Sequence, residues 1–178
     1  WMSRGTHAAI GSPDFEGLLH FARDGITVNL GGMELTPFAV PHDAREPLQL
    51  RCTDGASHLG LLTDLGHASP HVLQQLQGCH ALLLEANHDP DMLAASGYPA
   101  FLKRRIAGVH GHLANHDAAG ILAAVRHTGL NRVVAAHLSA QNNQPRLAQQ
   151  ALAHALDWPA EGVDIASPTA GTDWINVV

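Results

Sequence analysis

The sequence has 178 residues, enough for one domain with a sizeable hydrophobic core. A hydrophobic content of 46% and a charged content of 15% are typical of a globular protein and exclude a wholly disordered chain. The formal net charge of −6 argues against a protein that grips nucleic acid through a broad basic surface. It does not exclude an enzyme that holds phosphate groups through metal ions.

Two further features of the composition narrow the class of protein. The sequence contains no apolar run of the roughly 18 residues that a membrane span needs. Its two cysteines, Cys52 and Cys79, lie far apart and outside any CxxC motif, which supports neither a disulfide framework nor a thiolate zinc site. A reducing compartment, the cytoplasm, is therefore expected. Histidine occurs 14 times, and we expect only three to five of these residues to be functional.

The first part of the chain is rich in predicted strands. Residues 6–9 and 14–21 are expected to be short helical stretches, separated by Gly11-Ser12-Pro13. The predicted strands that follow are residues 26–30 and 33–40, joined by the glycine pair Gly31-Gly32, and then residues 48–52 and 58–63. Ser69 and Pro70 are typical of the start of a helix, which we expect to continue to residue 77.

The second part of the chain alternates between the two kinds of element. Short apolar runs predict buried strands at residues 81–84 and 133–136. Helices are expected at residues 90–96, 99–106, 115–127 and 145–156, and edge strands at 163–165 and 174–178. No linker or repeat divides the sequence, so residues 1–178 are interpreted as one α/β domain.

Polar residues gather where the predicted strands end, which is where open α/β sheets bind their ligands. They are His42 and Asp43, Asp64, Glu85 and His137, with His112 just before a predicted helix. Taken singly, Asp64 could cap a turn, Asn115 could be an ordinary helix N-cap, and His42 or His137 could be a hydrogen-bonded core histidine. Glu85 is harder to dismiss, because a carboxylate at the end of a buried strand needs a partner. Imidazole and carboxylate together suit Zn, Mn or Fe.

The order of motifs resembles a known family. PHDA, TDLG, LLLEANHD, YPAFLKRRIAGVHGHLAN and AHLSAQNNQP follow one another as in the metallo-β-lactamase fold, and they look most like its WalJ/YycJ-type branch of bacterial nucleases. The resemblance covers nearly the whole chain. It implies an α/β (α+β) fold, the four-layered αββα sandwich, and a two-metal phosphodiesterase site.

The resemblance also implies roles for individual residues. His42, Asp64 and His137 match metal ligands, with Asp64 as the residue that bridges two divalent ions. Glu85 and His112 resemble a catalytic glutamate–histidine pair that acts near the leaving group. Candidate substrate-binding residues are Asn87, His88 and Asn115 from the same motifs, and Lys103 and Arg105 from the one basic cluster, whose alternative interpretation is a solvated helix face.

One departure from the family is serious, because its hallmark His-x-His-x-Asp-His occurs nowhere in this sequence. We therefore expect the chain to represent the C-terminal two-thirds of the fold, with an incomplete metal site and with Trp1 internal to a longer protein. A separate complementing chain is the alternative.

Three functions remain open at this stage. The first is a metal-dependent DNA exonuclease that acts on single strands or ends through a water activated by two metal ions. The second is a phosphodiesterase for a small cyclic or linear ester, which suits the acidic net charge. The third is an inactive, metal-binding fragment. The expected partners are accordingly DNA or a small phosphodiester, a second copy of the chain in a homodimer, and the missing N-terminal segment, with no membrane.

Overall fold

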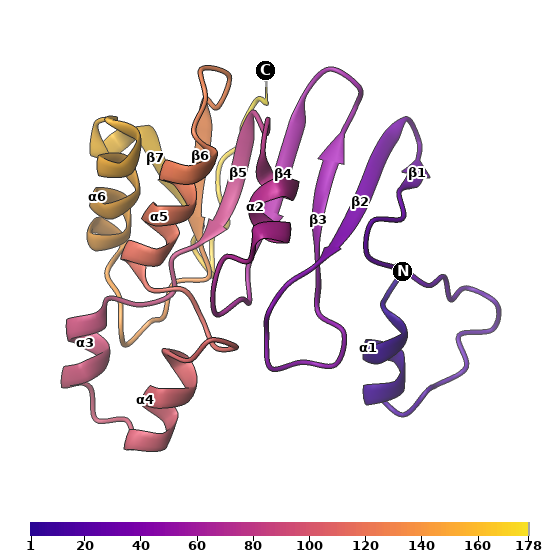
Figure 1. The fold of residues 1–178 in the computed structure, drawn as a ribbon, viewed down its shortest axis with the longest axis horizontal. Coiled ribbons are helices and arrows are strands. Elements are labelled where there is room, and N and C mark those ends of the chain that lie inside the picture. Colours follow the sequence, from indigo (N-terminus) through magenta and orange to yellow (C-terminus); the bar gives the residue numbers. More distant parts are fainter. Residues whose placement is uncertain (178) are drawn as a thin grey trace.

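A computed structural model of the chain describes residues 1–177, and its centre is a seven-stranded sheet (Figure 1). The strands lie side by side in the order in which they occur in the chain. They are β1 (Val28–Leu30), β2 (Met33–Ala39), β3 (Leu48–Thr53), β4 (His58–Leu62), β5 (Ala81–Glu85), β6 (Arg132–Ala136) and β7 (Val163–Ile165). Pairs from β1 to β4 are antiparallel, whereas pairs from β4 to β7 are parallel. The expectation of a mixed α/β fold is confirmed.

Local sequence explains the strand-rich half. Gly31 and Gly32 both have positive φ values, 61° and 91°, which the two-residue turn between β1 and β2 requires. In the parallel half, the apolar residues of β5 and β6 are mostly buried, as expected for strands in the middle of a parallel sheet.

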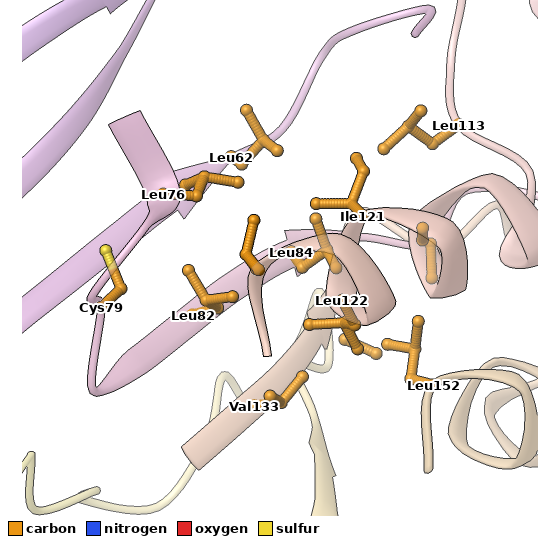
Figure 2. Close-up of a cluster of buried hydrophobic side chains, with 14 of the residues drawn as sticks. Leu62, Leu76, Cys79, Leu82, Leu84, Leu113, Ile121, Leu122, Val133 and Leu152 are labelled. Atoms are coloured by element: carbon orange, nitrogen blue, oxygen red, sulfur yellow. The ribbon is translucent and has the colours of Figure 1, made fainter. Parts of the chain in front are cut away.

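Three helices cover one face of the sheet: α2 (Pro70–Leu76), α5 (Asn115–Val125) and α6 (Pro145–Leu156). Figure 2 shows the core between this face and the helices, where Leu82 and Leu84 of β5 meet Leu122 of α5 and Leu152 of α6. All four of these side chains are fully or almost fully buried. The start of α2 agrees with the sequence, because the Ser69 hydroxyl accepts a hydrogen bond from the Val72 amide at 3.2 Å.

The opposite face of the sheet is apolar but less covered. Leu61 and Leu83 are paired in register, and since side chains alternate along a strand they point away from Leu62, Leu82 and Leu84. Both are only half-buried. The described residues thus form one sheet of the expected αββα sandwich, with its helices on a single side.

The remaining helices lie at one end of the sheet and at its edge. These are α1 (Arg4–Ala9), α3 (Pro90–Ala95), α4 (Ala100–Ile106) and the short 3₁₀ helix η1 (Ala160–Gly162). In Figure 1, α3 and α4 lie together beyond the carboxyl end of β5. Among residues 1–177, no helix combines the length and the apolar character that crossing a membrane would require.

Two elements predicted from the sequence are wrong. Residues 14–21 form turns and irregular backbone instead of a helix, because Glu16 and Gly17 both adopt positive φ, 53° and 83°, which a helix does not allow. Residues 174–177 are not a strand, and Trp174 is fully exposed. Val178, the last residue of that prediction, lies outside the described residues. Helix α5 also ends at Val125 and not at residue 127, since Arg126 has an extended backbone with ψ 137°.

Candidate active site

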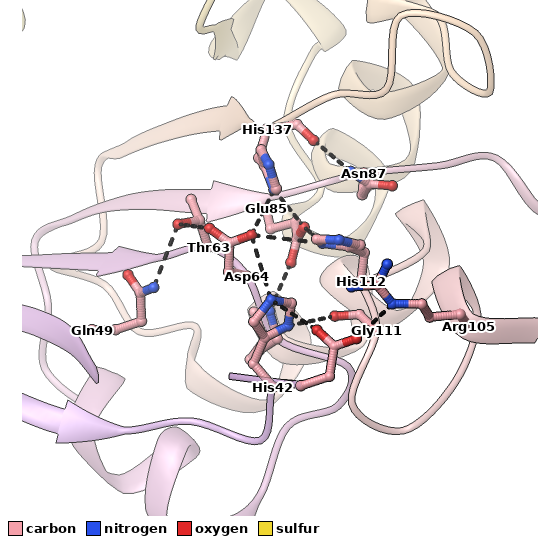
Figure 3. A network of polar contacts seen from close by, with 12 residues as sticks. His42, Gln49, Thr63, Asp64, Glu85, Asn87, Arg105, Gly111, His112 and His137 are labelled. Atoms are coloured by element: carbon pink, nitrogen blue, oxygen red, sulfur yellow. Dashed lines mark hydrogen bonds and ion pairs between the residues drawn. The ribbon is translucent and has the colours of Figure 1, made fainter. Parts of the chain in front are cut away.

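Four side chains of the candidate site follow strands that run in the same direction. Asp64 comes two residues after β4, Glu85 is the last residue of β5, and His137 comes directly after β6. These three strands are parallel, so their carboxyl ends meet at one edge of the sheet. His42 follows β2, which runs in the same direction as β4 because two antiparallel pairs separate them. His112 joins them from the loop between α4 and α5 (Figure 3).

Glu85 is at the centre of this group. Its side chain has 0% exposed surface, and its Oε1 accepts hydrogen bonds from His112 Nδ1 at 2.8 Å and from His137 Nδ1 at 2.7 Å. Its other oxygen, Oε2, accepts the Leu65 amide at 3.1 Å. Burial alone would raise the pKa of this carboxyl, but the three hydrogen bonds outweigh burial and hold the pKa below its usual value. Glu85 is therefore an ionised, fully bonded carboxylate.

The same bond affects His137. Its hydrogen bond to Glu85 raises the pKa of the imidazole above the ordinary histidine value, against the opposing effect of burial. The sequence pairs Glu85 with His112, and the structure brings those two together. The sequence analysis missed that His137 shares the same oxygen. A carboxylate that follows three leucines is the one signal that could have suggested two partners.

Asp64 and His42 form the remaining part of the group. Asp64 Oδ1 lies 3.9 Å from His42 Nε2 and 3.7 Å from His137 Nδ1. His42 is held from its other nitrogen, since Nδ1 lies 3.0 Å from the Gly111 carbonyl oxygen, which accepts its N–H. The structure thus brings His42, Asp64 and His137, which are distant in sequence, to one place, with Nε2 of His42 directed at the carboxylate (Figure 3).

The backbone at two of these residues has an unusual conformation. Asp64 and His137 have φ values of 52° and 56°, in the left-handed region that side chains other than glycine rarely adopt. Such strain persists where the surroundings enforce it, and it concentrates at functional sites. Asn87 supplies part of that enforcement, because its Nδ2 donates to the His137 carbonyl at 2.9 Å. The structure therefore places Asn87 against the backbone of His137.

Close backbone packing positions His112. A Cβ atom on Gly111 would overlap the carbonyl oxygens of Arg105 and Ile106, so only glycine allows this loop to approach the end of α4. The His112 amide donates to the Ile106 carbonyl at 2.8 Å across the same approach. The sequence analysis did not single out Gly111, although a glycine between two histidines is a signal for such a requirement.

Two basic side chains of α4 have different hydrogen-bond partners. Arg105 Nε donates to Asp43 Oδ2 at 2.6 Å, and this bond lowers the pKa of the Asp43 carboxyl. Asp43 Oδ1 in turn lies 3.4 Å from His42 Nε2, which connects Arg105 to the site. Lys103 Nζ instead donates to the Ala94 carbonyl at 2.6 Å, on the side of α3.

Two other residues expected to bind substrate are buried. Asn115 exchanges amide hydrogen bonds of 2.9 and 2.8 Å with Asn143, whose Nδ2 also reaches the Ala86 carbonyl. This pair joins the start of α5 to the loop before α6. His88 is 2% exposed, burial lowers its pKa, and its Nδ1 has no hydrogen-bond partner among the described residues.

The donor set fits divalent metal ions. Two groups of three side chains hold potential ligand atoms within 4.8 Å of one another, namely His42, Asp64 and His112, and then Glu85, His112 and His137. Histidines that bind a metal through one nitrogen commonly donate the other N–H to a carboxylate or a carbonyl, which His42, His112 and His137 all do here. Imidazole and carboxylate ligands suit Zn, Mn or Fe.

Comparison with known proteins identifies the family of the chain. The family described as the beta-lactamase superfamily domain matches residues 18–138. The chain belongs to this family. Among curated proteins, it is 36% identical over 143 residues to the exodeoxyribonuclease YycJ of Bacillus anthracis, and 31% identical over 146 residues to the exodeoxyribonuclease WalJ of Streptococcus pneumoniae. These matches cover 80% and 82% of this chain but 54% of either relative, so the chain spans about half their length.

Solved structures show the same superfamily fold. The metallo-β-lactamase fold protein YhfI from Bacillus subtilis superimposes with a TM-score of 0.62 at 14% identity, covering 83% of this chain and 52% of YhfI. Zn²⁺-bound PqqB from Methylobacterium extorquens gives a TM-score of 0.58 at 16% identity, covering 93% of this chain and 58% of PqqB. The expected metallo-β-lactamase fold is confirmed by these likenesses.

Proposed function

We propose that the protein is a metal-dependent phosphodiesterase that hydrolyses DNA, as an exonuclease acting on single strands or ends. The observation that carries the proposal is the buried Glu85 carboxylate with His112 and His137 on one oxygen, beside Asp64 and His42. The relatives named as exodeoxyribonucleases favour DNA over other phosphodiesters. Family membership supports the more general part of the proposal, metal-dependent hydrolysis.

In this function His42, Asp64 and His137 would hold the divalent metal ions. Two divalent ions, Zn or Mn and alternatively Fe, supply water activation and neutralisation of phosphate charge when bound. Asn87 fixes His137 through its carbonyl, and Arg105 holds Asp43 next to His42.

The remaining pair moves a proton. His112 donates its Nδ1–H to Glu85, which leaves Nε2 to carry a proton toward the leaving oxygen of the substrate. The Glu85 carboxylate fixes the orientation of the His112 ring. Since His112 belongs to both groups of potential ligands, its assignment as a proton donor competes with a role as a metal ligand.

The decisive experiment compares three substrates in the presence of Mn²⁺ or Zn²⁺. Linear single-stranded DNA, circular single-stranded DNA and bis-nitrophenyl phosphate are each incubated with the wild type and with Asp64→Asn. An exonuclease degrades the linear strand and spares the circle, and Asp64→Asn abolishes both cleavage and metal content. Hydrolysis of the nitrophenyl ester without cleavage of any DNA would refute the nuclease proposal.

A small phosphodiester is the second candidate substrate. The net charge of −6 favours it, because a polyanionic strand is repelled by an acidic protein and a small ester is repelled less. Preference of the enzyme for a cyclic or short linear diester over DNA in the same assay would select this alternative.

Two aspects of assembly belong to the proposal. We propose that another polypeptide surface covers the sheet and completes the site, which the half-buried leucines on the open sheet face and the single histidine per metal ion support. That surface is a further segment of the same protein or a separate chain, a second copy included. Metal analysis of the chain alone tests whether another polypeptide surface completes the site, since two bound metal ions per chain would show that no further surface is needed.

A cytoplasmic location is proposed because two free, buried cysteines suit a reducing environment.

A further inference from the structure

An open cleft lies between α3 and α4, next to the candidate active site. Its volume is about 420 Å³, within the range of small-ligand sites. Most of its walls are apolar, from Pro90, Leu93 and Ala94 on the side of α3 and Ala107 after α4. A cleft with such walls suits a flat, weakly polar group.

A polar atom without a partner accompanies this apolar lining. His88 lines the cleft, and its Nδ1 is buried with no hydrogen-bond partner among the described residues. Buried polar atoms are almost always hydrogen-bonded, because an unmade bond costs free energy. His88 is thus a lining residue with a buried, unsatisfied nitrogen.

Two cations complete the lining, from successive residues of α4. Lys103 and Arg104 both line the cleft. The Lys103 ammonium donates to the Ala94 carbonyl at 2.6 Å across the cleft, which fixes its position while two further N–H groups remain. Arg104 is exposed, and no aspartate or glutamate lines the cleft beside it. The cleft thus combines an apolar surface with positive charge, and a ligand with a flat ring and an anionic group matches both.

Residues of the cleft are close along the chain to residues of the candidate active site. His88 follows Glu85 by three residues, and its backbone pairs with Ala114, two residues after His112. On α4, Lys103 and Arg104 line the cleft whereas Arg105 pairs with Asp43 beside His42. A strand whose scissile phosphate lay at the site would place a neighbouring nucleotide within reach of the cleft.

We propose that the cleft between α3 and α4 binds one nucleotide of single-stranded DNA next to the scissile phosphate. The base lies against Leu93 and Ala107, and the adjoining phosphate lies against Lys103 and Arg104. The strand is single because a base must be unstacked and unpaired to enter a cleft. This inference rests on the proposed function for the class of substrate.

The first test fills the cleft. Ala94→Leu places a larger side chain into it from an exposed helical position, and Ala95→Leu is the matched control, because Ala95 is exposed on the same helix and does not line the cleft. Leucine is a good helix former, so neither change disturbs α3. Fluorescence anisotropy of labelled oligothymidylate, without metal ions, should show roughly ten-fold weaker binding for Ala94→Leu, the scale of one lost base contact. Ala95→Leu should bind as the wild type.

The second test measures the phosphate contact. For single strands, each phosphate contact contributes about 0.7 to the slope of log affinity against log salt. Arg104→Gln should lower that slope by about 0.7, whereas Arg132→Gln, at the far end of β6, should leave it unchanged. An unchanged slope for Arg104→Gln, equal binding by the two leucine variants, or equal affinity for duplex and single-stranded DNA would each overturn the proposal.

Failure of this inference can be told apart from failure of the proposed function. Binding is measured without metal ions and does not depend on turnover. If the wild type cleaves DNA but Ala94→Leu binds and cleaves it equally well, the nucleotide site is wrong and the nuclease proposal stands. If the wild type binds the strand through the cleft but does not cleave it, the nuclease proposal is wrong and the nucleotide site stands.

Discussion

Glu85 and His137 are 52 positions apart in the chain, yet Glu85 Oε1 and His137 Nδ1 lie 2.7 Å from each other. The same oxygen accepts the N–H of His112. One carboxylate oxygen therefore fixes the orientation of two imidazoles, one from the end of β6 and one from the loop before α5. Changes at Glu85 should affect both histidines together.

Glu85→Gln should lower the pKa of His137 and reduce metal affinity by about 10- to 100-fold. The pKa of His137 is raised chiefly by the hydrogen bond to the carboxylate, and a neutral amide oxygen attracts the imidazolium less. The ring proton signals of metal-free protein, followed by NMR as pH changes, measure the pKa. An unchanged pKa would mean that the Glu85 charge does not govern His137.

His112→Ala should slow DNA cleavage by roughly 10²–10⁴-fold while leaving metal content intact, because it removes a proton donor and not a ligand. The loss should shrink on bis-nitrophenyl phosphate, whose nitrophenolate departs without a proton. Rate measurements on both substrates and metal analysis are made on the same preparation. Equal losses on both substrates would indicate phosphate binding by His112, and loss of metal would make it a ligand.

Gly111→Ala should destabilise the fold by about 1–3 kcal/mol, as expected for overpacking against backbone. The added Cβ overlaps the Arg105 and Ile106 carbonyls, so relief of the clash moves the loop that carries His112. Thermal unfolding measures the first effect and the rate of DNA cleavage the second. Gly97→Ala is the control, because a Cβ there meets nothing within 4 Å and should leave both quantities unchanged.

Asp24→Asn tests a contact outside the group of candidate site residues. Asp24 Oδ1 accepts bonds from the Ala39 amide and from His71 Nε2, both at 2.9 Å, and these bonds lower its pKa despite the opposing effect of burial. A carboxyl with a lowered pKa in the folded state stabilises the protein above its unfolded pKa and ceases to do so as pH falls through the folded one. Because the pair is half-exposed, we expect Asp24→Asn to lower the free energy of unfolding by about 0.5 kcal/mol at neutral pH. Urea unfolding should show that this difference disappears below the pKa of Asp24 in the folded protein.

The sequence predicted the strands and most helices because their signals are local. The glycine pair at Gly31-Gly32, the apolar runs of β5 and β6 and the cap at Ser69 each act within a few residues. Residues 14–21 were predicted wrongly because an apolar spacing that suits a helix is overridden by left-handed backbone at Glu16 and Gly17. The false strand at residues 174–177 arose from apolar residues that no neighbouring strand pairs in the described part of the chain.

The candidate site was predictable in its members but not in its bonds. The positions of Asp64, Glu85 and His137 at the ends of predicted strands allowed them to be predicted, because the carboxyl ends of parallel strands lie at one edge of the sheet. Which nitrogen meets which oxygen depends on backbone conformation. Asp and His adopt positive φ more often than most residues, but residue type alone does not predict that Asp64 and His137 do so. The close approach at Gly111 likewise depends on the path of α4, which no local pattern in the sequence encodes.

The strand order has a consequence for how the protein is made. Because the spatial order of strands is the order of synthesis, each strand from β2 onward can pair with one that has already left the ribosome. The sheet can therefore grow outward at one edge without waiting for distant partners. Glu85 emerges with β5 and must remain without one of its three hydrogen bonds until β6 brings His137, so the candidate centre is completed only once most of the chain has been synthesised.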